Sequence, residues 1–342
     1  MPELKIELPS SIHGRLPVLD ELKGLAILLV VLYHAGGVLV WQNLLHGDLG
    51  VDIFVILSGI GLTLSARTAT EPTVTFMRRR LVRIMPAYWI ALTLYWAVNS
   101  HYLQHHYTPT NIVLHYLGIH GWFGDIYAMS INDSFWFITL IITLYLIFCA
   151  VRSLGNDLGR LLFVGGAFSW AFAYAMFSTG QAGSFGHLGL RVPGFFAGLV
   201  IGQLLRDGRL NLKLDWPLFG GLVLFAYLPY LQGFIFFSPI AALALMAGFT
   251  FIWKRFAPKP VLESSSRVLT FLGNHSLEIF LLHQPLIREY NYYLHGRWFN
   301  IPTPTPGSLM VGMAIGITVT LLVSVELRQL IARFLPREKS PV

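Results

Sequence analysis

Ten apolar segments, each close to the length needed to cross a bilayer, determine what this chain can fold into. They lie at residues 22–40, 50–66, 84–99, 134–151, 161–178, 187–205, 214–231, 234–253, 268–287 and 307–327. A helix needs about 20 apolar residues to span the hydrocarbon core. Charged residues make up only 12% of the chain, against about 25% in soluble domains. We therefore predict an all-α fold, a polytopic transmembrane helical bundle of about ten spans, with residues 1–342 forming a single integral-membrane domain.

The distribution of Lys and Arg gives these segments an orientation. With the N-terminus in the cytoplasm, 21 of the 24 Lys and Arg residues fall on the cytoplasmic side. Cytoplasmic loops of membrane proteins carry such an excess. Both termini are then expected to be cytoplasmic, with residues 1–20 as an N-terminal segment and 329–342 as a basic tail. The N-terminal segment, residues 1–20, has no apolar core, so we expect no removable signal peptide. The net charge of +7 thus reflects topology and predicts no nucleic-acid partner.

The first apolar segment carries an ionisable residue, His34, near its middle. Ionisable side chains inside a membrane are costly and are usually functional. On an α-helix, Asp20, Lys23 and His34 point to nearly the same side, and Lys23 and His34 are separated by about 16 Å of rise. A neutral imidazole can take a proton from a hydroxyl and return it. His34 is therefore a candidate general base, and packing against a neighbouring helix is the structural alternative.

Four stretches of the chain resemble the integral-membrane acyltransferase-3 family, which includes bacterial O-antigen and exopolysaccharide acetylases. They are LDELKGLAILLVVLYH (19–34), GVDIFVILSG (50–59), FMRRRLVRIMPAYW (76–89) and LGNHSLEIFLLHQPL (272–286). The first is similar to the family's Arg-x10-His helix, the third carries its Arg-x-x-Arg pair, and the fourth is similar to its late Ser…His-x-Pro helix. Lys23 stands where the family has arginine, which keeps the charge but loses the paired donors of a guanidinium.

The resemblance implies a membrane-bound O-acyltransferase of the bacterial cytoplasmic (inner) membrane. It would move an acetyl or other short acyl group from cytoplasmic acyl-CoA to a sugar hydroxyl of a cell-surface or exported glycan. His34 would be the catalytic base, and Arg80 and Arg83 would bind the acyl donor, whose phosphates suit guanidinium groups. Lys23 and Arg78 are further candidates for donor binding. Anchoring at the cytoplasmic surface and contact with anionic lipids are the alternative for the arginine group, above all for Arg78. The expected partners are acyl-CoA, with acetyl-CoA first among them, a glycan or lipid-linked saccharide acceptor, and membrane lipids. No permanently bound cofactor is expected.

Further residues are candidates for supporting or cavity-lining roles. Asp20 shares the polar side of the first helix, and Asp52 lies near the outward end of the second span. Ser58 belongs to a small-residue surface that favours close helix packing. His283, in the late motif, either packs within the bundle or lines the catalytic cavity. Arg191 is an isolated charge near the outer end of its span, where an acceptor glycan could meet it.

The longest outward segment, about residues 100–133, is rich in histidine and contains neither Lys nor Arg. Its histidines are His101, His105, His106, His115 and His120. Their spacing suits no tight ligand set, so we expect a solvated loop and no metal site.

Two other classes of function fit parts of the pattern. A secondary transporter would also have about ten helices with Gly and Pro breaks and an ionisable residue at the midplane. Two related halves would favour it, and no internal repeat is visible in the sequence. A non-catalytic assembly or lipid-flipping partner is the other alternative. In that case His34→Ala would leave glycan acylation intact.

Overall fold

The computed structural model describes residues 16–38, 47–65, 71–124, 127, 130–152, 157–179, 188–209, 238–250, 256, 258–289 and 305–334. Within these ranges the chain forms helices and no β-strand. The α-helices are α1 (Pro17–Val38), α2 (Gly47–Leu64), α4 (Thr73–His101), α5 (Pro109–Tyr116), α7 (Trp136–Val151), α8 (Leu158–Thr179), α10 (Val192–Arg206), α12 (Ser238–Gly248), α14 (Lys259–Asn274), α15 (Ser276–Gln284) and α17 (Pro306–Phe334); a 3-10 turn, η2 (His120–Phe123), and a π-helical turn, η6 (Pro285–Glu289), complete the set. The predicted all-α fold is confirmed.

Nine of the ten predicted apolar segments coincide with helices, and the tenth, residues 214–231, lies outside the described residues. Three described helices, α2, α4 and α17, are long and apolar enough to cross a membrane. The prediction of one continuous span at 268–287 is wrong. The chain leaves helical geometry at His275, with φ −106° and ψ 12°, so α14 and α15 are separate helices.

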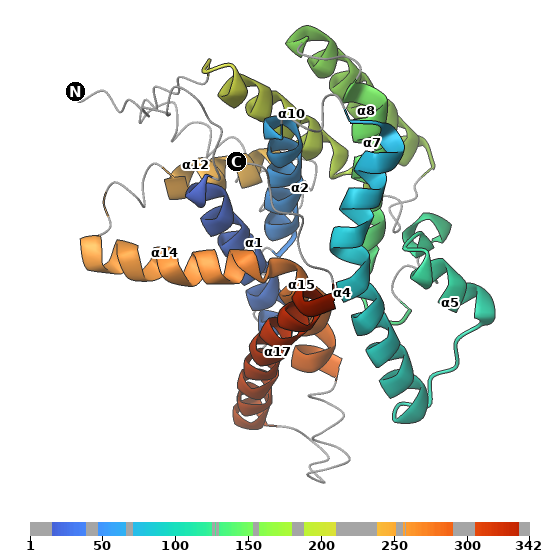
Figure 1. Cartoon of the computed structure of the whole chain (residues 1–342). Helices are drawn as coiled ribbons and strands as arrows, with labels where there is room; N and C mark the ends of the chain where they lie inside the picture. Colours follow the sequence, from blue (N-terminus) through green and yellow to red (C-terminus); the bar gives the residue numbers. More distant parts are fainter. Residues whose placement is uncertain are drawn as a thin grey trace.

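Helices α1 and α2 lie at the centre of the bundle, and α10 packs along α2 on its other side (Figure 1). The close contact between α2 and α10 depends on glycines in both helices. A Cβ on Gly59 would lie 2.5 Å from the carbonyl oxygen of Phe195, and one on Gly198 would overlap the carbonyl oxygen of Ile56. Small residues let helix backbones approach closely where lipid removes the hydrophobic driving force.

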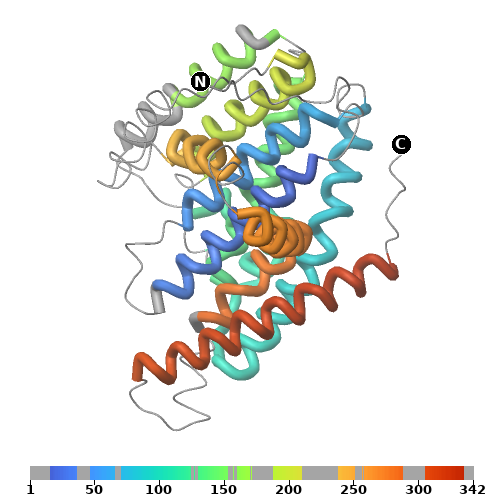
Figure 2. Tube along the Cα trace, turned by 90° about the vertical axis from the view of Figure 1, so that its left-hand side faces the viewer, coloured from blue at the N-terminus to red at the C-terminus, as the bar shows by residue number. Residues whose placement is uncertain are grey.

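Helix α14 runs across α1, and in the second view it is seen nearly end-on (Figures 1 and 2). At the crossing, Gly24 of α1 meets the backbone of Leu269, and Gly273 of α14 meets the backbone of Asp20. A side chain at either glycine would collide with the facing backbone. This close crossing brings the start of α15 against the first turns of α1, where Asp20 and Lys23 lie.

Side chains from other parts of the chain bind the C-terminal end of α15, where Pro285 interrupts the hydrogen bonds of the helix itself. Pro285 has no N–H to donate to the Leu281 carbonyl oxygen one turn earlier. Asn132 Nδ2 donates to that oxygen at 3.1 Å, and the Tyr95 hydroxyl donates to the Leu282 carbonyl oxygen at 2.7 Å. Both donors are buried. They hold the turn of α15 on which His283 lies.

Candidate active site: a cationic cavity and a histidine pair

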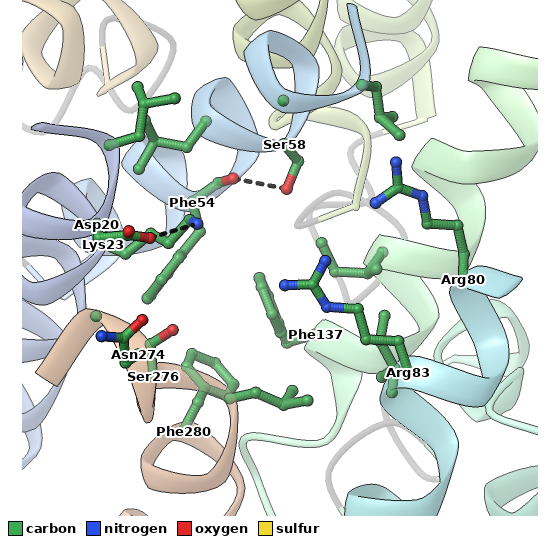
Figure 3. A pocket seen from close by; sticks show the side chains of 18 of the residues that line it. Asp20, Lys23, Phe54, Ser58, Arg80, Arg83, Phe137, Asn274, Ser276 and Phe280 are labelled. Atoms are coloured by element: carbon green, nitrogen blue, oxygen red, sulfur yellow. Dashed lines mark hydrogen bonds and ion pairs between the residues drawn. The ribbon is translucent and has the colours of Figure 1, made fainter. Parts of the chain in front are cut away.

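A cavity of about 540 Å³ lies between the N-terminal turns of α1, the end of α2, the early part of α4, and α7, α15 and α17 (Figure 3). Its volume is within the usual range for small-molecule sites. The charged residues that line it are Asp20, Lys23, Arg80, Arg83, Glu278 and Arg328. Arg80 and Arg83 point into it from one wall, and Asp20 and Lys23 lie on the opposite wall. The cavity therefore combines three of the four predicted donor-binding residues.

The four cations of the cavity differ in their partners. Lys23 Nζ lies 3.2 Å from Asp20 Oδ1, and Arg328 Nη1 lies 3.9 Å from Glu278 Oε2. Within the described ranges, neither Arg80 nor Arg83 has a carboxylate within ion-pair distance. The two arginines therefore give the cavity an excess of positive charge on the wall formed by α4.

Aromatic rings hold Arg80 in its position. Its guanidinium carbon lies 5.5 Å from the centre of the Phe76 ring and 5.9 Å from that of Tyr145. A cation over an aromatic face is stabilised by the ring quadrupole. The buried Nε of Arg80 has no hydrogen-bond partner among the residues that the structure describes. Arg78, two residues earlier on α4, is exposed and does not line the cavity, so the structure does not bring it together with Arg80 and Arg83.

His34 forms a pair with His283, which the sequence placed 249 positions away. The Nδ1 atom of His34 lies 3.0 Å from Nε2 of His283. The Nδ1 atom of His283 lies 2.8 Å from the carbonyl oxygen of Phe280 and 3.2 Å from that of Ile279. His283 is fully buried and His34 is half-buried.

The neighbours of the pair fix where its protons lie. A carbonyl oxygen only accepts, so Nδ1 of neutral His283 carries the proton and its Nε2 is an acceptor. The Nδ1–H of His34 can then donate to that Nε2, and it shares this proton with the Val30 carbonyl oxygen at 3.0 Å. In this tautomer the Nε2 atom of neutral His34 carries no proton. That is the form of imidazole that accepts a proton in general-base chemistry.

The remaining predicted residues fall into two groups. Ser58 lines the cavity, and its hydroxyl donates to the Phe54 carbonyl oxygen at 2.8 Å. Asp52 does not line the cavity; it is fully buried and lies 2.5 Å from Nη1 of Arg191. Ser238 also donates to Asp52. The suggestion that Arg191 is an isolated charge facing an acceptor glycan is therefore wrong, because its charge is compensated inside the protein.

The outward segment is less solvated than predicted. His101, His105 and His106 are exposed, but His115 and His120 are fully buried, and their rings stack with centres 4.0 Å apart. Burial lowers the pKa of His115 to about 4. Burial is the main cause that lowers the pKa of His120 well below its usual range, and the neighbouring His115 lowers it further. The prediction of a solvated loop is therefore wrong for these two residues. No cluster of three metal-ligating side chains occurs among the described residues.

Sequence reasoning missed several residues that shape the cavity. Arg328 counted only as part of the cytoplasmic excess of positive charge, although its position at the inner end of the last span could have suggested it. Tyr145 lies within the uniformly apolar segment of α7 and gave no signal. Three phenylalanines of the cavity wall, Phe54, Phe137 and Phe280, likewise looked like ordinary membrane-span residues.

Comparison with known proteins gives a consistent match. The acyltransferase-3 family model, described as an acyltransferase domain, matches residues 16–325. A protein of Komagataeibacter xylinus named as a membrane-bound transacylase, BcsY, is 46% identical over 71 residues, which cover 20% of this chain and 17% of that protein. A protein of Acidianus two-tailed virus named as an acetyltransferase, ORF330, is 28% identical over 163 residues, 47% of this chain and 48% of that protein. The chain thus matches less than half of the length of either relative. No solved structure matches the chain.

Proposed function

The chain belongs to the acyltransferase-3 family, and from this premise we propose that it is a membrane O-acyltransferase that uses acyl-CoA as donor and a sugar hydroxyl as acceptor. One observation carries the proposal. Arg80 and Arg83 line a cavity with Lys23 and have no carboxylate partner among the described residues. The His34–His283 pair adjoins Phe280, which also lines that cavity. Cations for the phosphates and a base for the hydroxyl are the two requirements of such a transfer.

The donor would bind with its phosphates at the wall formed by α4. Guanidinium groups bind phosphate oxygens through paired, charge-assisted hydrogen bonds. The predicted orientation places this side in the cytoplasm, where acyl-CoA is found. The pantetheine arm would then extend along α1 from the level of Lys23 towards His34.

In the proposed catalysis, the unprotonated Nε2 of His34 is the base. The acceptor hydroxyl gives its proton to Nε2 while its oxygen attacks the thioester carbonyl carbon. A new C–O bond forms, the C–S bond breaks, and the CoA sulfur leaves with the proton that His34 returns. His283 would act as a positioning residue, because its Nε2 accepts the Nδ1–H of His34 and stabilises the positive charge that develops on the ring.

Binding of coenzyme A itself tests the donor site. We expect CoA to raise the melting temperature of the purified protein in detergent, because a ligand that binds only the folded state stabilises it. Arg80→Ala and Arg83→Ala each remove charged hydrogen bonds worth about 1.5–3 kcal/mol, which predicts a Kd for CoA that is about 10- to 100-fold higher. Arg78→Ala is the matched control, since it removes the same charge from the same helix outside the cavity. Equal loss in all three variants, or no effect of CoA on the wild type, would contradict the proposed site.

A second experiment tests the chemistry. We expect His34→Ala to abolish ester-linked acyl groups on the surface glycan of the producing cells, measured by mass spectrometry, while CoA still protects the variant against heat. Retained binding with lost acylation separates a catalytic defect from a folding defect. Unchanged acylation would refute the role of His34 and would favour a non-catalytic function.

A further inference from the structure

Three phenylalanine side chains from three helices meet at one end of the cavity. Phe54 of α2, Phe137 of α7 and Phe280 of α15 all line it (Figure 3). Their ring centres are separated by 6.0 Å for Phe54 and Phe137, 6.4 Å for Phe54 and Phe280, and 4.4 Å for Phe137 and Phe280. These separations are those of aromatic rings in contact. The three rings therefore form a continuous apolar surface, which we call the phenylalanine floor.

Phe280 connects the phenylalanine floor to the histidine pair. The Phe280 ring centre lies 5.6 Å from that of His283, whose ring centre lies 4.9 Å from that of His34. Phe280 lines the cavity, whereas His34 and His283 do not. Phe280 therefore lies between the cavity and the histidine pair. A group that extends from the cavity towards the histidine pair in this direction passes the Phe280 ring, which contacts Phe54 and Phe137.

We propose that Phe54, Phe137 and Phe280 form the acyl-group subsite and limit the length of the acyl chain that the protein accepts. This inference rests on the proposed function, since it assigns the part of acyl-CoA that the arginines do not bind. The acyl group is the apolar end of the donor, and its carbonyl carbon must approach the acceptor near His34. With the phosphates held at Arg80 and Arg83, that end is directed to the phenylalanine floor.

The tight packing of the phenylalanine floor predicts a preference for short acyl chains over long ones. Phe137 and Phe280 are 7% and 3% exposed, so their rings are already packed against other side chains. Buried protein interiors accommodate an extra methylene only with strain. Pockets of this kind discriminate between substrates that differ by one methylene by about 10- to 200-fold. We therefore expect a steep decrease in acceptance from acetyl to longer chains.

The test compares the binding of CoA, acetyl-CoA, butyryl-CoA and hexanoyl-CoA to purified full-length protein by isothermal titration calorimetry. Phe280→Leu and Phe137→Leu enlarge the subsite and are expected to improve the affinity for butyryl-CoA, relative to acetyl-CoA, by about 10-fold or more. Phe54→Trp reduces the subsite and is expected to weaken acetyl-CoA relative to CoA. Phe195→Leu, a change at a fully buried ring of α10 that does not line the cavity, is the control and should leave all ratios unchanged.

The outcomes separate this inference from the one on which it rests. CoA alone has no acyl group, so its affinity reports only on the arginine site. If the wild type binds no CoA, the donor site is refuted and the acyl subsite with it. If CoA binds, and the order of acyl-chain affinities is the same in Phe280→Leu, Phe137→Leu and the wild type, the phenylalanine floor is not the acyl subsite. A shift towards longer chains in the leucine variants only, and not in Phe195→Leu, supports it.

Discussion

The stacked histidines of the outward segment should make the protein sensitive to mild acid. His115 and His120 are fully buried, and Tyr88 of α4 covers them, with its hydroxyl donating to the His115 carbonyl oxygen at 2.8 Å. Nδ1 of His115 is hydrogen-bonded to the Asn111 carbonyl oxygen at 2.9 Å. The buried Nε2 of His115 has no hydrogen-bond partner among the described residues. A proton added to this ring would therefore place a charge in an environment that cannot solvate it.

The sign and size of the effect follow from the pKa of His115. Burial lowers this pKa from 6.5 to about 4, so between these pH values the unfolded segment binds a proton that the folded segment does not. Stability must then decrease as the pH falls from about 6.5 to about 4. At about 1.4 kcal/mol per pKa unit, the loss is about 3 kcal/mol for His115. The lowered pKa of His120 acts in the same direction.

Hydrogen exchange of the amides in α5 and η2 measures this loss where it arises. After correction for the intrinsic pH dependence of exchange, we expect protection of these amides to decrease about 100-fold between about pH 7 and about pH 4.5. The variant with both His115→Phe and His120→Phe keeps the stacked rings and removes the titration, so its protection should change far less over the same range. A wild type that loses no more protection than this variant would refute the argument.

Three further predictions concern the described contacts of the bundle. His283→Phe keeps a ring but removes the acceptor for the Nδ1–H of His34, so we expect acyl transfer to decrease by about 100-fold or more while the Kd for CoA is unchanged. Arg191→Met leaves Asp52 buried without its cation, which should lower the stability in detergent by about 3–5 kcal/mol, and the double variant with Asp52→Leu should recover most of that loss. Asn132→Ala removes the donor to the Leu281 carbonyl oxygen and should lower stability by about 1–3 kcal/mol, measured by thermal unfolding in detergent.

The cationic wall could be predicted from the sequence because its geometry is local. Arg80 and Arg83 are three residues apart, so a helix places them on one side, and the distribution of Lys and Arg predicts a cytoplasmic location for that side. The same local reasoning put Arg78 beside them, and here it was insufficient. On the helix, a difference of two residues turns a side chain away from its neighbours, and only the packing of α4 decides which side faces the cavity.

The contacts that join distant parts of the chain could not be predicted in this way. His34 and His283 are 249 residues apart and lie on α1 and α15, so their contact depends on how these two helices pack. The sequence also favoured one continuous span where α14 and α15 are separate helices. Arg191 looked isolated because its partner, Asp52, is 139 residues earlier and lies on another helix. His115 and His120 looked solvated because their segment is polar, and their burial depends on Tyr88 of α4 covering them. In each case tertiary packing brings together the residue and a partner that is distant in the sequence, and this partner determines its environment.

Arg191 is buried and Arg80 is half-buried in the same bundle, and the two side chains differ in how their charges are compensated. A charged side chain inside a membrane protein is costly unless it is paired. Arg191 meets this condition within the fold, since Asp52 and Ser238 surround its guanidinium. Arg80 has aromatic rings and, within the described ranges, no carboxylate in ion-pair distance. The charge of Arg191 is compensated by a carboxylate of the protein, whereas Arg80 gains most from an anion that enters the cavity. This difference is the physical reason for the proposal that Arg80 and its neighbour Arg83 bind the phosphates of the donor.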